Sequence, residues 1–538
     1  MGLSKQTQRL ARRENDSVWR QQEVSPLPAG APHEATKVVI VGTGPVGLAL
    51  AIDLGMRGHE VVVLGKFDFV PAGSKAICFS KRSLDILHRL GVGEQAVTQG
   101  VTWNVGKVFW KDSRDPIYQF DMLPLKQQKM PGFINLQQYH LESLLLERLT
   151  ELPNVDVRWG HRVADVRSDQ SDACVSVDCR DGSYSIDAEW LVACDGNRSL
   201  IRDRLGLDFE GRIFEDNFLI ADVRMKGDFP AERWFWFDPP FNPGRSVLLH
   251  KQPDDVWRID FQLGWNIDRE ACVRPENVDP LVRAMLGPDI DFEQEWYSVY
   301  TFQCRRMARF VHGRTIFAGD SAHLVSPFGA RGCNGGFADI DNLGWKLDLV
   351  LRGECDENLL ESYNYEAITT ADENILNSTR STDFLTPKSV VSTAFRDAVL
   401  DLAGETEFAR SFVNSGRLST AVSYPDSPLN TPDTDTWAAG ISPGSPALDA
   451  PLGDGWLLER LGGRFVVLCN GAPEHLAADL DCIDLSNVPG AELAIERFEL
   501  LPGSAYLIRP DQYVAARFRE PTVTQLAQAH NRAIGGHP

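Results

Sequence analysis

A glycine-rich turn between an apolar strand and a helix is the feature that most constrains this fold. Residues 37–41 form a short β-branched run, which is typical of a buried parallel strand. The turn Gly42-Thr43-Gly44-Pro45-Val46-Gly47 follows directly, and apolar residues then recur at helical spacing over 48–54. A second predicted strand at 60–64, apolar from Val61 on, completes a strand–turn–helix–strand unit, so the sequence predicts an α/β fold with a parallel sheet.

The glycines of this turn predict nucleotide binding. Gly42 permits the tight turn, Gly44 lets the backbone approach a pyrophosphate, and Gly47 allows close helix–strand packing. The helix that begins at Pro45 and Val46 offers unpaired N–H groups to the phosphates. A plain structural turn is the alternative, which the strand–turn–helix context disfavours.

One position departs from the usual nucleotide-binding pattern. An acidic residue about 20 residues beyond the turn normally accepts a hydrogen bond from the ribose hydroxyl. Gly65 and Lys66 occupy that place here, and Asp68, the nearest carboxylate, lies past the strand end. How the ribose is held therefore stays open.

Two later segments place carboxylates at the ends of predicted strands. Asp195 follows the apolar run 190–194, and Gly319-Asp320 follows the run 315–318. The carboxyl ends of parallel strands are where ligands bind in such sheets. A glycine-rich loop from Pro327 then leads into a helix that begins near Cys333 and Asn334, whose free N–H groups suit an electron-rich ligand edge.

Together the three motifs resemble the single-component FAD-dependent aromatic hydroxylases, and most closely the 3-(3-hydroxyphenyl)propionate hydroxylase-like subgroup. The resemblance implies that Asp195 lies beside the FAD pyrophosphate and that Gly319 and Asp320 hold the ribityl chain. The pyrimidine end of the flavin is expected at the helix start, and the flavin ring beside the preceding loop. The residues implied there are Gly332, Cys333 and Asn334 at the helix start, with Pro327 and Arg331 from the loop.

Secondary cofactor contacts follow from the same resemblance. Lys75 stands where the family commonly has an arginine that reaches the adenosine and pyrophosphate. Gln138 matches a glutamine that touches the ribityl chain, and Val163 lies in a strand that passes the adenine. A solvated lysine and a plain core valine are equally good interpretations of Lys75 and Val163.

The predicted fold class is α/β: a Rossmann-like FAD-binding domain, an inserted β-sheet substrate domain and a C-terminal thioredoxin-like α/β domain. The expected ranges are 1–35 flexible tail, 36–210 and 306–400 FAD-binding domain, 211–305 substrate domain, 401–440 helix and linker, 441–525 thioredoxin-like domain, and 526–538 tail. Residues 257–263 alternate strictly between apolar and polar, which predicts a half-buried strand. The polar candidates for phenol contact in the substrate domain are His250, Gln262 and Tyr300.

Composition excludes several function classes. Lys and Arg number 54 against 75 Asp and Glu, a net charge of −21 that argues against nucleic acid and anionic membranes. The sequence contains no membrane-length apolar run and no signal-peptide core, so we expect a cytoplasmic enzyme. The ten cysteines are scattered, so we expect no metal site. The sequence contains no CxxC motif. Cys469 and Cys482 are too far apart to form one, so we expect no redox exchange.

The resemblance implies a reaction with NADH or NADPH, O2 and a small phenolic substrate. The coenzyme reduces FAD, the reduced flavin captures O2 as a C4a-hydroperoxide, and its distal oxygen attacks the phenol. The same scaffold serves polyketide or antibiotic rings and Baeyer–Villiger insertion, which stay open as alternatives. The departures at Gly65 and Lys75 also leave open a degenerate flavin-binding protein without turnover. A homodimer is a further open expectation, with a structural or dimerisation role for the last domain.

Overall fold

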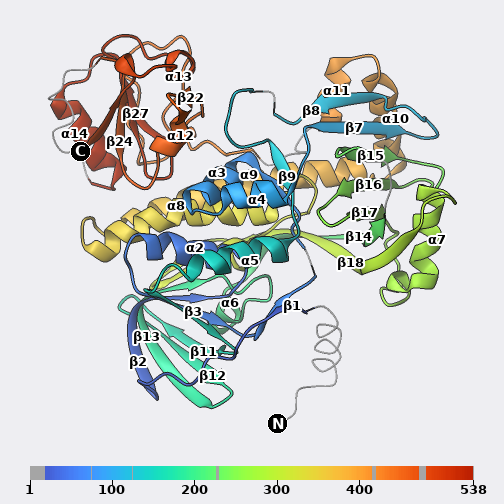
Figure 1. Ribbon diagram of the computed structural model, residues 1–538, viewed down its shortest axis with the longest axis horizontal. Helices are drawn as coiled ribbons and strands as arrows, with labels where there is room; N and C mark the ends of the chain where they lie inside the picture. Colours follow the sequence, from blue (N-terminus) through green and yellow to red (C-terminus); the bar gives the residue numbers. More distant parts are fainter. Residues whose placement is uncertain are drawn as a thin grey trace.

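The computed structural model describes most of the chain as three regions of secondary structure. Figure 1 shows a sheet below a layer of helices, a second sheet beside them, and a C-terminal unit above the helix layer. The described residues are 18–73, 75–123, 125–225, 229–414, 420–471 and 480–536. No helix among these residues is long and apolar enough to cross a membrane.

The first sheet is the parallel sheet that the glycine turn predicts. Strand β2 pairs in parallel with β3 and β13, while β11, β12 and β13 form an antiparallel extension. Val38, Val39 and Ile40 are all fully buried, because both faces of the sheet are covered. The strands are β2 (His33–Val41), β3 (Val61–Gly65), β10 (Val155–Trp159), β11 (Arg162–Ser168), β12 (Ala173–Cys179), β13 (Gly182–Ala193), β19 (Val311–His312) and β20 (Thr315–Phe317).

A layer of helices packs over the first sheet (Figure 1). Helix α2 contacts both α5 and α8, so the helix of the glycine turn lies beside the helix of the third motif. A small sheet of β5, β9 and β6 adjoins this layer. The helices of the layer are α2 (Pro45–Met56), α3 (Lys81–Arg89), α4 (Gly93–Gln99), α5 (Gln138–Leu149), α8 (Gly332–Arg352) and α9 (Leu359–Leu385), and the small strands are β5 (Cys78–Ser80), β6 (Val101–Thr102) and β9 (Phe133–Asn135). The short helix α6 (Leu200–Arg204) contacts β11 of the first sheet.

The second sheet has the order β21-β18-β14-β17-β16-β15-β7-β8. Helix α7 contributes to the apolar cluster on one face, and α10 and α11 contribute to another cluster against the sheet. Its strands are β7 (Val105–Trp110), β8 (Tyr118–Asp121), β14 (Phe209–Met225), β15 (Arg233–Phe237), β16 (Ser246–Lys251), β17 (Val256–Gln262), β18 (Phe292–Met307) and β21 (His323–Leu324). The helices are α7 (Pro275–Leu286), α10 (Val390–Ala403) and α11 (Glu407–Asn414).

Two features of the second sheet differ from expectation. Strands β7 and β8 belong to it although they lie within the range 36–210, because β7 pairs in parallel with β15. β17 is not half-buried: Trp257, Ile259 and Phe261 pack in one apolar cluster, while Arg258, between them, is also buried. Neither face of this strand is turned to the outer surface, because its polar side chains line a cavity.

The C-terminal domain is built on a sheet of order β25-β24-β26-β27. β24 pairs in parallel with β25 and antiparallel with β26, and β26 and β27 form a hairpin. The domain is therefore built on a mixed sheet, and its thioredoxin-like character stays a prediction. Its elements are β22 (Pro451–Leu452), β23 (Gly455–Trp456), α12 (Leu457–Arg460), β24 (Val466–Cys469), β25 (Asp481–Asp484), α13 (Glu492–Phe498), β26 (Ala505–Ile508), β27 (Val514–Phe518) and α14 (Val523–Ala533).

Both predicted tails require correction. Val18–Gln21 forms β1, which pairs antiparallel with β4 (Phe69–Pro71), and β2 already begins at His33. Residues 1–17 of the N-terminal tail lie outside the described residues. At the other end α14 buries Leu526 and Ala529 against the C-terminal sheet, because its apolar residues recur at helical spacing.

A buried ionic cluster joins the C-terminal domain to the helix layer. Arg509 lies 2.7 Å from a carboxylate oxygen of Glu366 in α9 and 2.5 Å from Asp511. The Lys346 ammonium of α8 lies 2.8 Å from the other Glu366 oxygen. Burial alone would raise the pKa of Glu366, but Arg509 and Lys346 lower it below its ordinary value. The domain is therefore held by mutually paired buried charges, which are costly to separate.

Candidate active site

One cavity of about 690 Å³ lies between the first and second sheets and joins all three sequence motifs. The glycine turn contributes to one part of its wall, the start of α8 to another, and strands β14 to β18 to a third. The predicted residues that line it are Gly42, Gly44, Pro45, Val46, Lys66, Lys75, Gln138, Val163, Asp195, His250, Tyr300, Asp320, Pro327, Arg331, Gly332 and Cys333. Segments far apart in the chain thus meet around a single space.

The glycine turn has the geometry of an anion site. Gly42 has a φ of +124°, and a Cβ there would lie 2.2 Å from the carbonyl oxygen of Cys194. A Cβ at Gly44 would meet nothing within 4 Å, so its missing side chain leaves room in the cavity. No side chain caps α2, and its first N–H groups are left for a ligand.

Three predicted glycines act behind the cavity wall rather than in it. A Cβ at Gly47 would lie 2.1 Å from the carbonyl oxygen of Gly42, so this position requires glycine for close packing. A Cβ at Gly65 would lie 2.7 Å from the Thr43 side chain. Gly319 has a φ of +63°, which places Asp320 at the bend after β20.

Asp195 presents a carboxylate with spare hydrogen-bonding capacity. It follows β13, and its Oδ2 accepts a hydrogen bond from the Ile201 N–H at 3.3 Å. Its Oδ1 is buried and has no hydrogen-bond partner among the described residues. Burial raises the pKa of Asp195, against the hydrogen bond from the Ser199 side chain. A ligand hydroxyl donor would satisfy the remaining oxygen.

Asp320 and the start of α8 face the cavity together. The Asp320 side chain is exposed to the cavity, while the surrounding protein raises its pKa by desolvation. Helix α8 begins without a side-chain cap, and its first backbone bond runs from the Gly335 N–H to the Arg331 carbonyl. The N–H groups of Gly332 and Cys333 precede that bond, so this end carries the positive part of the helix dipole.

Two predicted residues at this helix start are held by protein partners. Asn334 donates to the Cys78 carbonyl and accepts from the Ser80 N–H, both at 3.0 Å, so its side chain fixes β5 against α8. It does not line the cavity. The Arg331 guanidinium donates to Asn374 of α9 at 2.9 Å, and burial lowers its pKa to about 10.

His323 stabilises the loop that follows β20. Its Nε2 lies 2.6 Å from a carboxylate oxygen of Asp339 in α8. The same oxygen accepts a hydrogen bond from the Gly319 N–H at 2.8 Å. This buried trio fixes the Gly319 turn relative to the start of α8.

Gln138 links two segments of the wall at the start of α5. Its side chain accepts from the Ala76 N–H at 3.2 Å and donates to Glu142 at 2.8 Å. Burial raises the pKa of Glu142 to about 7, against the opposing effect of the Gln138 hydrogen bond. Glu142 also lines the cavity, and its position four residues after Gln138 on one helix face was the available signal.

The second sheet supplies both polar and apolar wall residues. His250 is buried, its Nε2 lies 3.2 Å from Asp260, and its Nδ1 has no hydrogen-bond partner among the described residues. Burial lowers the pKa of His250 to about 4, and Arg233 adds to the effect. Burial and the nearby Asp320 raise the pKa of Tyr300 to about 12, so its hydroxyl stays protonated.

Gln262 does not join this wall. Its side-chain oxygen accepts a hydrogen bond from the Ser246 N–H at 2.9 Å, so it fixes the end of β16 against β17. The expected contact with a phenol is therefore absent from the described cavity lining. A glutamine at a strand end has backbone groups within reach, and here they take its side chain.

Three charged wall residues were missed by sequence reasoning. Arg258 is paired with Asp222 through two contacts of 2.7 and 2.8 Å, and Asp260 holds His250. Arg233 is buried, and no carboxylate among the described residues lies within ion-pair distance of it. Its nearest polar partner is the Cys78 sulfur at 3.8 Å. The alternation of β17 was the signal that could have placed Arg258 and Asp260 on one face.

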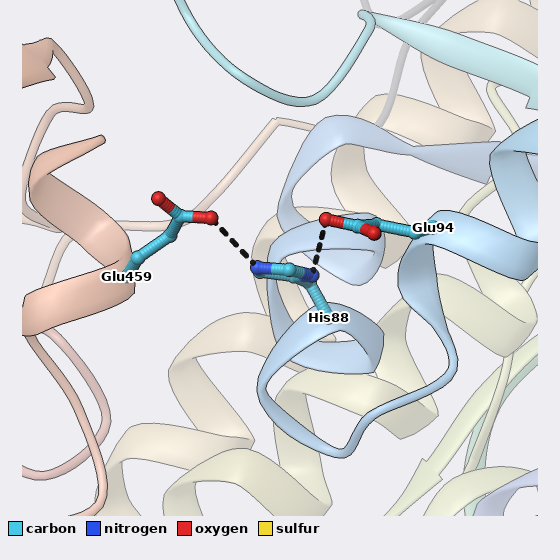
Figure 2. Close-up of side chains that lie close together, drawn as sticks. All are labelled: His88, Glu94 and Glu459. Carbon is cyan, nitrogen blue, oxygen red and sulfur yellow. Dashed lines mark ion pairs between the residues drawn. The ribbon is translucent and has the colours of Figure 1, made fainter. Parts of the chain in front are cut away.

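A second cluster of titratable groups lies between α3, α4 and the C-terminal domain. Figure 2 shows His88 between Glu94 and Glu459, with its ring nitrogens 4.0 and 3.4 Å from the two carboxylates. The Lys129 ammonium bonds both carboxylates and lies 3.2 Å from the His88 ring. A protein cation thus already pairs with both carboxylates of this cluster.

Comparison with known proteins places this cavity in context. A family model described as an FAD binding domain matches residues 35–378. A probable NADH-specific resorcinol 4-hydroxylase from Rhodococcus jostii is 32% identical over 341 residues, 63% of this chain and 63% of that protein. A 6-methylpretetramide 4-monooxygenase from Streptomyces rimosus is 33% identical over 429 residues, 76% of this chain and 74% of that protein. The chain therefore spans slightly under two thirds of the first relative and about three quarters of the second.

Solved structures extend the likeness to nearly the whole chain. The flavin-dependent monooxygenase PieE, in complex with FAD and substrate, has a TM-score of 0.77 at 21% identity and covers 94% of this chain and 100% of its own. Aklavinone-11 hydroxylase with FAD and aklavinone has a TM-score of 0.76 at 20% identity, covering 93% and 99%. At these identities the likeness shows the fold alone, and coverage this high includes the C-terminal domain.

Proposed function

This chain belongs to the FAD-dependent aromatic hydroxylase family, and we propose that it hydroxylates a small phenolic substrate at the expense of NADH or NADPH. The observation that carries the proposal is the single cavity in which the glycine turn, Asp320 and the α8 start meet His250 and Arg233. The resorcinol hydroxylase relative, named as NADH-specific, favours NADH as the reductant.

The residues of the cavity fit FAD by their chemistry. The open space at Gly44 and the α2 N–H groups suit the pyrophosphate, and Asp195 has an oxygen to spare for a hydroxyl donor. Asp320 suits the ribityl hydroxyls, and the N–H groups at Gly332 and Cys333 suit the pyrimidine end. FAD bound there would supply hydride acceptance and oxygen activation, which no protein side chain provides.

His250 is the proposed base for the phenol. A carboxylate can only accept hydrogen bonds, so the Nε2 of His250 that faces Asp260 carries the ring proton. The Nδ1 of His250 therefore keeps a lone pair. With its pKa lowered to about 4, the ring is neutral at pH 7 and its Nδ1 can accept the hydrogen bond of the phenol hydroxyl. Because this pKa makes His250 a weak base, transfer of the proton requires the Arg233 guanidinium to stabilise the phenolate that forms. A deprotonated phenol is more electron-rich at its ortho and para carbons, which favours attack on an electrophilic oxygen.

Arg233 is the proposed anchor for a negatively charged oxygen of the substrate. A buried guanidinium without a carboxylate partner is costly, and an anionic ligand would offset that cost. The guanidinium also lies over the Trp103 and Phe235 rings at 5.5 and 5.2 Å, which limits its freedom to move. A phenolate or an aromatic carboxylate is therefore the expected ligand group.

Apolar side chains complete the pocket and limit the entry of water. Phe218 and Phe328 meet edge to face with ring centroids 4.8 Å apart, and both line the cavity. Water exclusion favours transfer of oxygen to the substrate over loss as peroxide. The cavity volume of about 690 Å³ must hold the cofactor as well, which favours a single small ring over a fused polyketide.

Reconstitution followed by turnover tests the proposal. The purified chain is incubated with FAD and supplied with NADH or NADPH, O2 and a series of phenols and phenolic acids. We expect a yellow protein whose coenzyme oxidation rises with a phenol, and a product that has gained one oxygen on the ring. We expect Asp320→Ala to lose FAD binding and the surface variant Asp372→Ala to retain it. That result would identify the cavity as the FAD site. A colourless protein that takes up no FAD contradicts the proposal, and ring expansion of a ketone substrate would replace hydroxylation by Baeyer–Villiger chemistry.

A further inference from the structure

The C-terminal sheet brings together two cysteines that the sequence separates. Cys469 ends β24 and Cys482 lies in β25, and their sulfur atoms are 3.5 Å apart. The two strands are parallel neighbours with Val467 opposite Cys482. Side chains alternate along a strand, so Cys469, two residues beyond Val467, lies on the same face as Cys482. Sequence spacing alone argues against a redox pair, whereas strand pairing brings the two sulfur atoms together.

The two thiols differ in access and in acidity. Cys469 is fully buried in the cluster between the sheet, α8 and α14, whereas Cys482 is exposed. A hydrogen bond from Cys469 lowers the pKa of the Cys482 thiol below its ordinary value, against the opposing effect of partial burial. The thiolate is the reactive form of cysteine, so Cys482 is the group that meets an oxidant first. Cys469 then stands in the place of a resolving thiol.

The local fold allows the sulfur atoms to close the remaining gap. A disulfide requires about 2.0 Å between the sulfurs, so they must approach by roughly 1.5 Å. β25 is a four-residue edge strand that pairs only with β24 among the described strands. Its movement therefore disturbs a single ladder of hydrogen bonds, and a buried central strand would not have this freedom.

We propose that Cys469 and Cys482 form a peroxide-responsive dithiol, a modification site remote from the cavity. The Cys482 thiolate attacks hydrogen peroxide, a sulfur–oxygen bond forms, the oxygen–oxygen bond breaks, and the departing hydroxide takes up a proton as water. The Cys469 sulfur then attacks the resulting sulfenic sulfur, forming the disulfide and expelling a second hydroxide, which becomes water. Two thiols lose two electrons and two protons, and one peroxide becomes two waters.

Peptide mapping of the full chain tests this site. The reduced protein is freed of reductant, treated with hydrogen peroxide, denatured, and alkylated before digestion. We expect a cross-linked pair of peptides carrying Cys469 and Cys482, which a dithiol reductant separates again. Cys272, a partly buried cysteine of the second sheet region, should stay alkylatable at the same peroxide dose.

Two variants make the outcome decisive. In Cys469→Ser we expect a sulfenic acid at Cys482 that a dimedone-type probe captures, with no cross-link. In Cys482→Ser we expect no oxidation of Cys469 at that dose, because the remaining thiol is buried. Wild-type protein that reaches sulfinic acid at Cys482 without a cross-link would overturn the proposal. Cross-links of Cys482 to other cysteines in equal yield would overturn it too. External peroxide makes the test independent of the hydroxylase activity.

Discussion

At the scale of single residues, the cavity wall carries charged and titratable side chains from the second sheet. Sequence reasoning placed His250 and Tyr300 in this wall, and both line it. It missed Arg233, because a residue next to the aromatic run 234–237 reads as part of a core strand. Only the register of β15 against β16, which sets Arg233 opposite His250, brings the guanidinium to the cavity. Strand pairing of this kind is not readable from one sequence.

His250→Gln tests the proposed base. We expect kcat to fall by about 10²- to 10⁴-fold for an ordinary phenol, because general-base catalysis contributes that much. A nitrophenol that is already ionised at neutral pH should be affected far less, since its proton is gone before binding. His312→Gln, outside the cavity lining, is the matched control. An equal loss for both phenols contradicts a role in proton transfer.

The same assignment predicts a pH dependence. His250 must be neutral to act, and its pKa is lowered to about 4, so activity should persist well below the ordinary histidine pKa of about 6.5. The acidic limb of kcat/KM should therefore fall near pH 4, and it should be missing in His250→Gln. If kcat/KM of the wild-type protein instead falls near pH 6.5, the base is a residue other than His250.

Arg233→Met tests the anion anchor. We expect KM for a phenolic carboxylate to rise about 10- to 100-fold, equivalent to about 1.4–3 kcal/mol for a lost charge-assisted hydrogen bond. The corresponding neutral amide or ester should change much less. Steady-state kinetics on the matched substrates measure the difference. A uniform loss across both would show that Arg233 holds the pocket together rather than the ligand.

The helices and strands determine how the cofactor motifs come together. The strand–turn–helix unit and the helix at residue 332 were predictable because their periodicity is local. The ordered strand at Val18–Gln21, the α14 helix and the membership of β7 in the second sheet were not, because each depends on a distant partner. Pairing across the fold, rather than propensity, creates these elements.

The glycine turn allows binding and folding to be separated. Gly44→Val should leave the apo protein's unfolding temperature nearly unchanged, since a side chain there meets open cavity, but should weaken FAD binding strongly. Gly47→Ala should instead lower the unfolding temperature, because its Cβ would clash with the Gly42 carbonyl. Flavin fluorescence titration and thermal unfolding measure the two effects. Equal destabilisation by both changes would contradict the assigned roles.

At the level of the whole molecule, the C-terminal domain is fixed by buried charges. Glu366→Gln should destabilise the protein by about 3–5 kcal/mol, because it leaves Arg509 and Lys346 without their shared partner. Glu361→Gln, which removes an exposed pair with Arg309, should cost at most about 1 kcal/mol. Denaturant unfolding measures both, and similar values for the two variants would contradict the role of the buried cluster.

The sign of the pH effect follows from the same cluster. The pKa of Glu366 is lowered in the folded state, so its contribution to stability is present above the ordinary glutamate pKa of about 4.3. That contribution is lost as the pH falls through the folded-state value. Wild-type stability should therefore drop more steeply than that of Glu366→Gln on acidification. If the stability of both proteins falls equally with pH, Glu366 is not the group responsible.

Oxygen labelling tests the proposed hydroxylation at the reacting atom, because it follows the oxygen that the cavity is proposed to deliver to the ring. The FAD-reconstituted chain is supplied with NADH, a phenolic acid and isotopically labelled O2, and the product is examined by mass spectrometry. We predict one labelled oxygen on the aromatic ring for each NADH consumed in a coupled turnover. NADH consumption that yields only labelled peroxide with every phenol tested, or no consumption at all, would contradict it.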